Sequence, residues 1–101
     1  MSIFAKGQKK NVVIDGVNFV IKKLSLEKQM TIKALYDNKK EEEGVLAMIN
    51  FCLESWDAKN DDGNVVPISP EAIKDMSIDV ANRLGDEIMS YNSPTKDEAK
   101  N

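Results

Sequence analysis

Histidine is absent from this chain of 101 residues, and cysteine and arginine occur once each. Without histidine, the chain lacks the commonest general base near neutral pH and the commonest metal ligand. The single cysteine, Cys52, excludes an intramolecular disulfide framework. These absences argue against most classes of hydrolase and metalloenzyme.

Long apolar runs are absent too. No stretch approaches the roughly 18 residues that a membrane span needs. The N-terminal segment, MSIFAKGQKK, has no apolar stretch long enough for a secretory signal. We therefore expect a soluble, cytosolic protein that does not engage membranes.

Catalytic motifs are equally scarce, since the sequence has no glycine-rich phosphate loop and no pair of carboxylates placed to converge in a cleft. One acidic loop has the middle residues of a calcium site, but Ala58 and Ser69 occupy its first and twelfth positions, where such a site needs carboxylates. Cys52 lies in an apolar helical stripe without a basic residue one turn away, which predicts a core residue. We expect no enzymatic activity, no metal and no cofactor.

Charge is distributed unevenly along the chain. The net charge is −3, but residues 1–33 carry seven lysines against Asp15 and Glu27, which leaves this part at +5 and the remainder at −8. The imbalance is either a solvated surface without a role or a feature that steers a charged partner. It also favours a homo-oligomer in which the positive end of one copy faces the negative end of another, and salt would weaken such an oligomer.

Residues 1–11 are basic and show no periodicity, so we expect a flexible arm. Two β-branched runs then flank Asp15 and Gly16, which predicts a β-hairpin over residues 12–22 because Asp-Gly suits a type I′ turn. A hairpin is only marginally stable by itself, so helices must cover one of its faces.

The remaining pattern predicts helices and a polar end. The expected helices span residues 25–38, 44–56, 69–75 and 77–91, and a disordered polar tail follows at 93–101. Ser25 and Ser69 are placed to cap the first and third of these helices. The predicted fold is α+β: one domain over residues 12–92, in which the N-terminal β-hairpin packs on a small bundle of three to four α-helices.

The first expected helix has two apolar sides. Three residues line each: Leu26, Met30 and Ala34 on one side, and Ile32, Leu35 and Tyr36 on the other. Either the helix is sandwiched in the core, or one side contacts a partner or a second copy. Phe51 also falls outside the main apolar stripe of its helix. Partner binding or self-association is therefore assigned to the residues outside a single core stripe: Ile32, Leu35, Tyr36 and Phe51.

The chain resembles the tail assembly chaperones of long-tailed, siphovirus-type bacteriophages in the order and spacing of its segments over residues 12–91. These segments are the hairpin and helix start VVIDGVNFVIKKLSLEKQM, the helix end LESW, the turn DDGNVV, and the closing stretches ISPEAI and VANRLGDEI. The resemblance implies a protein that binds the tape measure protein, keeps it soluble and helps to recruit the tail tube protein. It further implies location in the host cell cytoplasm and absence from the mature virion. No residue motif fixes the client site in this family, so no functional residue is transferred.

Two other classes of function remain open. A virion structural protein, such as a head-tail connector or tail completion protein, would also be small and α+β. A nucleic-acid-binding regulator would use the lysines around the arm and second strand: Lys6, Lys9, Lys10, Lys22 and Lys23. The acidic overall balance, the single arginine and the six aromatic residues argue against nucleic acid.

Overall fold

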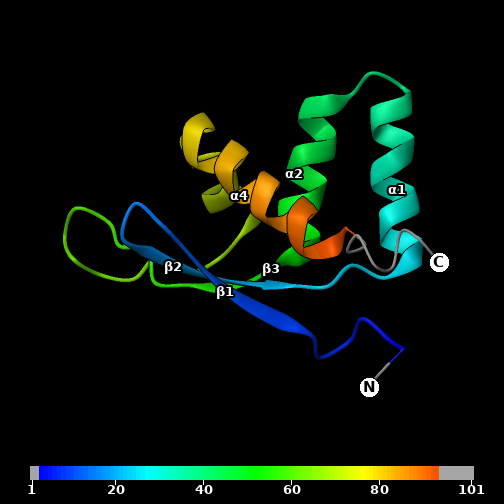
Figure 1. Cartoon of the computed structure of the whole chain (residues 1–101). Helices are drawn as coiled ribbons and strands as arrows, with labels where there is room; N and C mark the ends of the chain where they lie inside the picture. Colours follow the sequence, from blue (N-terminus) through cyan, green and yellow to red (C-terminus); the bar gives the residue numbers. More distant parts are fainter. Residues whose placement is uncertain (1–2, 94–101) are drawn as a thin grey trace.

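The computed structural model describes residues 3–93 and shows an α+β fold, as the sequence predicts (Figure 1). A three-stranded antiparallel sheet carries the helices on one face. The elements in chain order are β1 (Lys9–Ile14), β2 (Val17–Lys22), α1 (Leu26–Asp37), α2 (Glu41–Cys52), β3 (Leu53–Trp56), α3 (Pro70–Lys74) and α4 (Ile78–Asn92).

The β1–β2 hairpin closes at the predicted two-residue turn. Asp15 and Gly16 have φ of 51° and 79°, the left-handed values that a type I′ turn requires. Ile14 pairs with Val17 at the turn. Alternate residues of both strands are buried, which places one face of the hairpin in the core and leaves the other to solvent.

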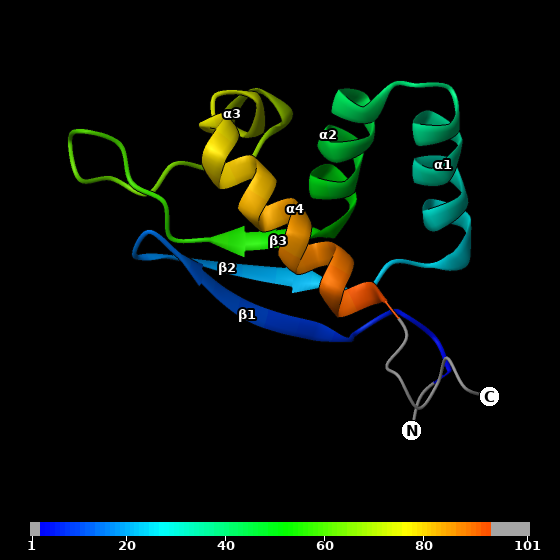
Figure 2. The ribbon, with the colours of Figure 1, turned by 45° about the horizontal axis from the view of Figure 1, so that its top comes forward.

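The helices pack side by side on one face of the sheet. Figure 2 shows α4 lying across the strands, while α2 stands beside it and α1 packs on the side of α2 away from α4. The core fills the space between the sheet and these helices. Its buried apolar members are Val12, Ile14, Phe19, Ile21, Ile32, Met48, Ile49, Cys52, Leu53, Ile73, Leu84 and Ile88.

Serine caps set the starts of three helices. The hydroxyl groups of Ser25 and Ser69 accept hydrogen bonds from the first-turn amides of Lys28 and Ala72, which confirms the two predicted caps. Ser77 caps α4 in the same way. Because such a side chain satisfies an amide that has no partner within the helix, it fixes the start of each helix locally.

The predicted helix over residues 44–56 is wrong at both ends. It begins at Glu41, because three glutamates in its first turn favour a helix N-terminus. It stops at Cys52, and the next four residues form β3, which pairs with β2. The strand places Leu53 opposite Ile21 and Trp56 opposite Phe19, and so adds a third strand to a hairpin that is marginal alone.

The predicted flexible arm at residues 1–11 is also partly wrong. β1 begins at Lys9, and the backbone carbonyl of Gln8 accepts a hydrogen bond from the amide of Lys23, 3.0 Å away. Pairing with β2 therefore orders a segment whose side chains alone gave no strand signal. The predicted tail, apart from Ser93, lies outside the described residues.

Candidate protein-binding surface

The side of α1 that was predicted to bind a partner, with Ile32, Leu35 and Tyr36, faces the inside of the protein, and the other side faces solvent. Ile32 is only 7% exposed and belongs to the core. Leu35 and Tyr36 are half-buried. The physical reason is that this side of α1 packs against α2, where Gly44 leaves room for the Tyr36 ring. Ile32 is thus wrong as a surface contact residue, and Tyr36 helps to join two helices.

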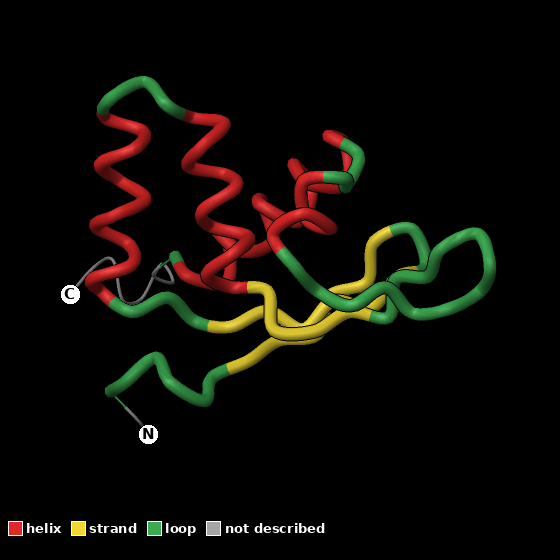
Figure 3. The backbone as a smooth tube through the Cα atoms, turned by 180° about the vertical axis from the view of Figure 1, so that it is seen from behind, coloured by secondary structure: helices red, strands yellow, loops and turns green. Residues whose placement is uncertain are grey.

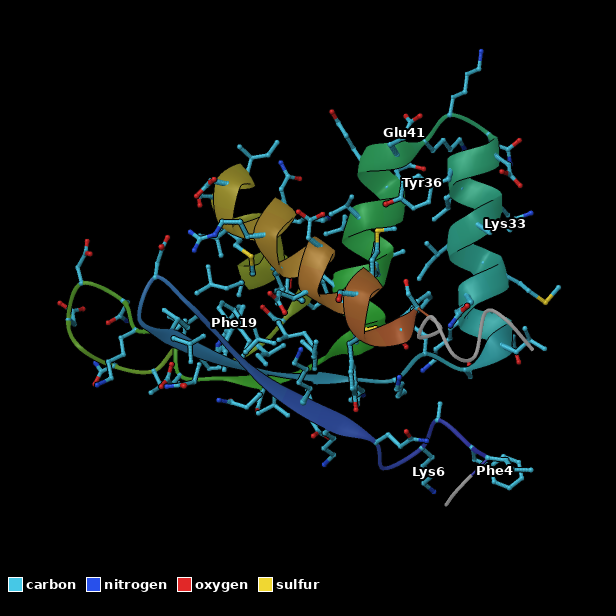
Figure 4. The ribbon with its side chains drawn as sticks, viewed as in Figure 1. Phe4, Lys6, Phe19, Lys33, Tyr36 and Glu41 are labelled. Carbon is cyan, nitrogen blue, oxygen red and sulfur yellow. The ribbon has the colours of Figure 1, made fainter. Side chains whose placement is uncertain are left out.

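Tyr36 lies between α1 and α2 close to the start of α2 (Figure 4). Burial raises the pKa of its hydroxyl group, and the negative charge of Glu41 raises it further. Both effects disfavour the phenolate, so Tyr36 stays neutral at ordinary pH. Tyr36 therefore serves to pack α1 against α2.

The other side of α1 is unpaired apolar surface. Leu26 is 77% exposed and Met30 is 62% exposed, and Ala34, one turn further on, is exposed as well. We call Leu26, Met30 and Ala34 the outer face of α1. Exposed apolar side chains in line along a helix are typical of a surface that binds another helix.

Phe51 lies apart from the other three predicted residues. It is half-buried near the end of α2, and the ammonium group of Lys28 on α1 lies 5.5 Å from the centre of its ring. Ile32 and Tyr36, by contrast, line a shallow groove of about 270 Å³ together with Leu24, Met48 and Met89. The structure therefore distributes the predicted residues over different surfaces and does not gather them into one site.

The N-terminal segment lies beside the start of α1. Ile3 and Phe4 are exposed, and the side-chain amide of Gln8 donates a hydrogen bond to the carbonyl of Phe4, 2.8 Å away. Figure 3 shows this segment and the start of α1 at the same end of the molecule. Exposed apolar side chains of the segment and of α1 are thus concentrated at one end.

Lysines surround a cavity at this end. The cavity has a volume of about 420 Å³, and Phe51, Glu54, Ser25 and backbone near Gly7 complete its lining. We call it the lysine cavity. Its lysines come from the N-terminal segment, from β1 and β2, from the connection after β2, and from α1: Lys6, Lys9, Lys22, Lys23 and Lys28.

Two of these lysines form an ion pair or a hydrogen bond within the described chain. The ammonium group of Lys9 lies 2.6 Å from a carboxylate oxygen of Glu54. Lys23 donates a hydrogen bond to the backbone carbonyl of Tyr91, and its ammonium group lies 4.3 Å from the centre of the Tyr91 ring. Within residues 3–93, the other three form no ion pair.

The sequence pattern indicated part of this basic cluster but not the cavity. Lys28 was missed, because it belongs to a helix that the pattern treats separately from the arm and the hairpin. Its position three residues after the Ser25 cap is the only local signal, since it places Lys28 in the first turn, at the end of α1 nearest the hairpin.

Cys52 lies under this surface and is fully buried. Burial raises the pKa of its thiol to about 11, and the positive charges of Lys22 and Lys28 reduce the shift. A thiol with such a pKa is almost wholly protonated at neutral pH and is a poor nucleophile. The residue contributes packing to the core.

An acidic loop projects at the other end of the molecule. It spans residues 57–66, and Lys59 and Val65 form a β-bridge across it. At its base, the backbone and side-chain amides of Asn18 each donate a 2.7 Å hydrogen bond to the carboxylate of Asp57. These bonds lower the pKa of Asp57. Asp61 and Asp62 lie at its tip.

No described helix is both long and apolar enough to cross a membrane. Residues 3–93 also contain no group of three cysteine or carboxylate side chains that could hold a metal ion. Comparison of the chain with protein-family models, with curated proteins and with solved structures found no match. A functional proposal therefore starts from the order of the sequence segments and from the surfaces described above.

Proposed function

We propose that this protein is a tail assembly chaperone of a long-tailed bacteriophage. In this proposal it binds helical segments of the tape measure protein in the host cytoplasm, keeps that protein soluble, and helps to recruit tail tube subunits. It has no enzymatic activity and leaves before the virion is complete. The proposal extends the resemblance found in the order of the sequence segments.

The outer face of α1 is the observation that supports it best. Leu26 and Met30 are four residues apart, so they lie one above the other on the helix. The opposite side of α1 packs on α2, so binding a client does not require the helix to leave the core. The outer face of α1 therefore suits the apolar stripe of an amphipathic client helix.

The side chains on the outer face of α1 suit a chaperone. Methionine is flexible and polarisable, so Met30 can adapt to client segments of different sequence. Charged residues make up 31% of the chain, which favours solubility of a complex whose apolar surfaces are covered. Holding a client in this way needs no nucleotide or metal, only exposed apolar area that the client buries.

Co-expression with fragments of the tape measure protein from the same phage tests the proposal. The parent chain should increase the soluble fraction of at least one fragment and be recovered with it on affinity resin. The variant Leu26→Asp with Met30→Asp should bind at least tenfold more weakly, because each lost apolar contact is worth about 1.5 kcal/mol or more when buried.

A matched control separates this face from apolar exposure in general. Ile78 and Met89 are an aliphatic residue and a methionine exposed on α4, and changing both to Asp should leave binding within about twofold of the parent. Circular dichroism should show that both double variants remain folded. Failure of the parent to bind any fragment, or its detection by mass spectrometry as a component of purified virions, would overturn the proposal.

A further inference from the structure

We propose that the lysine cavity of one copy of this protein receives the tip of the acidic loop, Asp61 and Asp62, of a second copy. The contact joins opposite ends of two molecules and is therefore head-to-tail. It goes beyond the proposed function, because its occupant is another copy of this chain and its surfaces are distinct from the outer face of α1.

The lysine cavity carries more positive charge than the one acidic residue of its lining neutralises. Glu54 is the one acidic residue in its lining and already pairs with Lys9. The ammonium groups of Lys6, Lys22 and Lys28 form no ion pair within the described part of the chain. These three like charges around one cavity repel each other. An anion that enters the cavity is attracted by all three and reduces their mutual repulsion.

The acidic loop presents its carboxylates in an ordered turn. The side-chain oxygen of Asn60 accepts hydrogen bonds from the amides of Asp62 and Asn64, at 3.0 and 3.1 Å. Gly63 turns the chain with φ of 82°. Neither Asp61 nor Asp62 forms an ion pair within residues 3–93. Because the turn is already ordered, binding costs little loop entropy.

The two surfaces lie too far apart to meet within one molecule. The longest dimension of the protein is 50 Å. Figures 1, 2 and 3 all show the acidic loop at one end and the N-terminal segment, which lines the lysine cavity, at the other. The complementary charges can therefore meet only between copies. Since the two contacting surfaces differ, each added copy leaves a free cavity and a free loop, and chains longer than a dimer can form.

The size of the contact predicts weak association. The cavity of about 420 Å³ accepts the tip of a loop and does not provide the extensive interface of a permanent dimer. Most of the attraction is electrostatic and partly exposed to solvent, so dissolved ions screen it. The expected behaviour is self-association that grows with protein concentration and disappears at high salt.

Sedimentation velocity of the full chain, measured over a range of protein concentrations, tests this contact. At about 50 mM salt the weight-average sedimentation coefficient should rise with concentration, and at about 500 mM salt it should stay at the monomer value. The cavity variant Lys22→Glu with Lys28→Glu and the loop variant Asp61→Lys with Asp62→Lys should each remain monomeric at low salt. The control Lys39→Glu with Lys74→Glu changes the net charge as the cavity variant does and should associate like the parent.

Mixing the two monomeric variants provides the decisive measurement. In the mixture, the reversed cavity of one variant meets the reversed loop of the other, and both unaltered surfaces also find partners, so association should return to within about threefold of the parent. The inference is overturned if the parent stays monomeric at low salt, if either reversed variant associates as the parent does, or if the mixture fails to associate. Equal loss in the control would assign the effect to net charge and would also overturn it.

Discussion

The ring of Tyr36 occupies the space that the side chain of any residue other than glycine would need at position 44. A Cβ atom at Gly44 would lie 2.9 Å from Cε2 of Tyr36, closer than carbon atoms pack in proteins. The pair lies near the connection between α1 and α2, so the glycine sets how closely these two helices approach. The same packing directs the Ile32 side of α1 inward and leaves its other face to solvent.

Substitution of Gly44 should therefore depend on Tyr36. In the parent chain, Gly44→Ala should lower the free energy of unfolding, because the displaced ring outweighs the gain of about 1 kcal/mol that alanine has over glycine in a helix. In a Tyr36→Leu background the same change should raise it by about 0.5–1 kcal/mol. Urea unfolding followed by Trp56 fluorescence gives the coupling energy, expected to be about 1 kcal/mol or more. Equal effects in both backgrounds would contradict the contact.

Cys52 should be inert in the folded protein. Its side chain is fully buried and its thiol pKa is raised to about 11, so at pH 8 only about one thiol in a thousand would be ionised even if it were exposed. Reaction with a disulfide reagent should be slow in buffer and fast in denaturing urea. The variant Ser55→Cys, with a second and exposed thiol, should show one fast equivalent when folded. Rapid labelling of the folded parent chain would show that the side chain of Cys52 is not buried in the core.

Asp57 should make stability depend on acid pH. Hydrogen bonds from Asn18 lower its pKa in the folded state. A carboxyl group with a lowered folded pKa contributes stability above its unfolded pKa and loses that contribution as the pH falls through the folded value. As the pH falls from the unfolded-state pKa of Asp57 to its lower folded-state pKa, the free energy of unfolding of the parent should therefore decrease.

An NMR titration of the Asp57 carboxyl carbon measures this pKa directly. Asn18→Ala removes the donating side chain, so it should move the pKa upward and reduce the loss of stability in acid. Asp57→Asn should reduce that loss as well, because it removes the ionisable group. An Asp57 pKa unchanged by Asn18→Ala would contradict the proposed cause of the shift.

Trp56 should show how far β3 depends on its side-chain contacts. Its indole N–H donates a 2.6 Å hydrogen bond to the carbonyl of Val66, and its ring meets Phe19 edge-on at 6.3 Å between centres. Trp56→Phe keeps an aromatic ring but removes the donor, and should cost about 1 kcal/mol of unfolding free energy. Trp56→Leu also removes the ring contact and should cost about 0.5–1.5 kcal/mol more. Chemical denaturation followed by circular dichroism makes the comparison independent of the lost fluorophore.

Elements whose signals are local were predictable from the sequence. The hairpin turn at Asp15 and Gly16 needs only two residues that accept positive φ, and the Ser25 cap needs only a hydroxyl before an apolar stripe. β3 was not predictable, because Leu53 and Trp56 also continue the helical spacing of the residues before them. Pairing with β2, which lies more than 30 residues earlier in the sequence, decides their conformation.

The candidate surfaces depend even more on long-range contacts. Both sides of α1 carry three apolar residues, so periodicity could not tell which one faces α2. The decisive feature is Gly44, which lies on another helix and admits the ring of Tyr36. The lysine cavity likewise combines side chains from the N-terminal segment, both strands of the hairpin and α1, which no local pattern joins.

The orientation of α1 can be tested by paired truncations on its two sides. Ile32→Ala should lower the free energy of unfolding by about 2–4 kcal/mol, because it leaves a cavity in a buried cluster. Met30→Ala, on the exposed outer face, should change it by no more than about 0.5 kcal/mol. Both variants introduce alanine, the residue with the highest helix propensity, so helix propensity does not explain a larger loss of unfolding free energy in Ile32→Ala. If Met30→Ala were the more damaging change, α1 would be turned the other way, and the surface proposed for client binding would belong to the core.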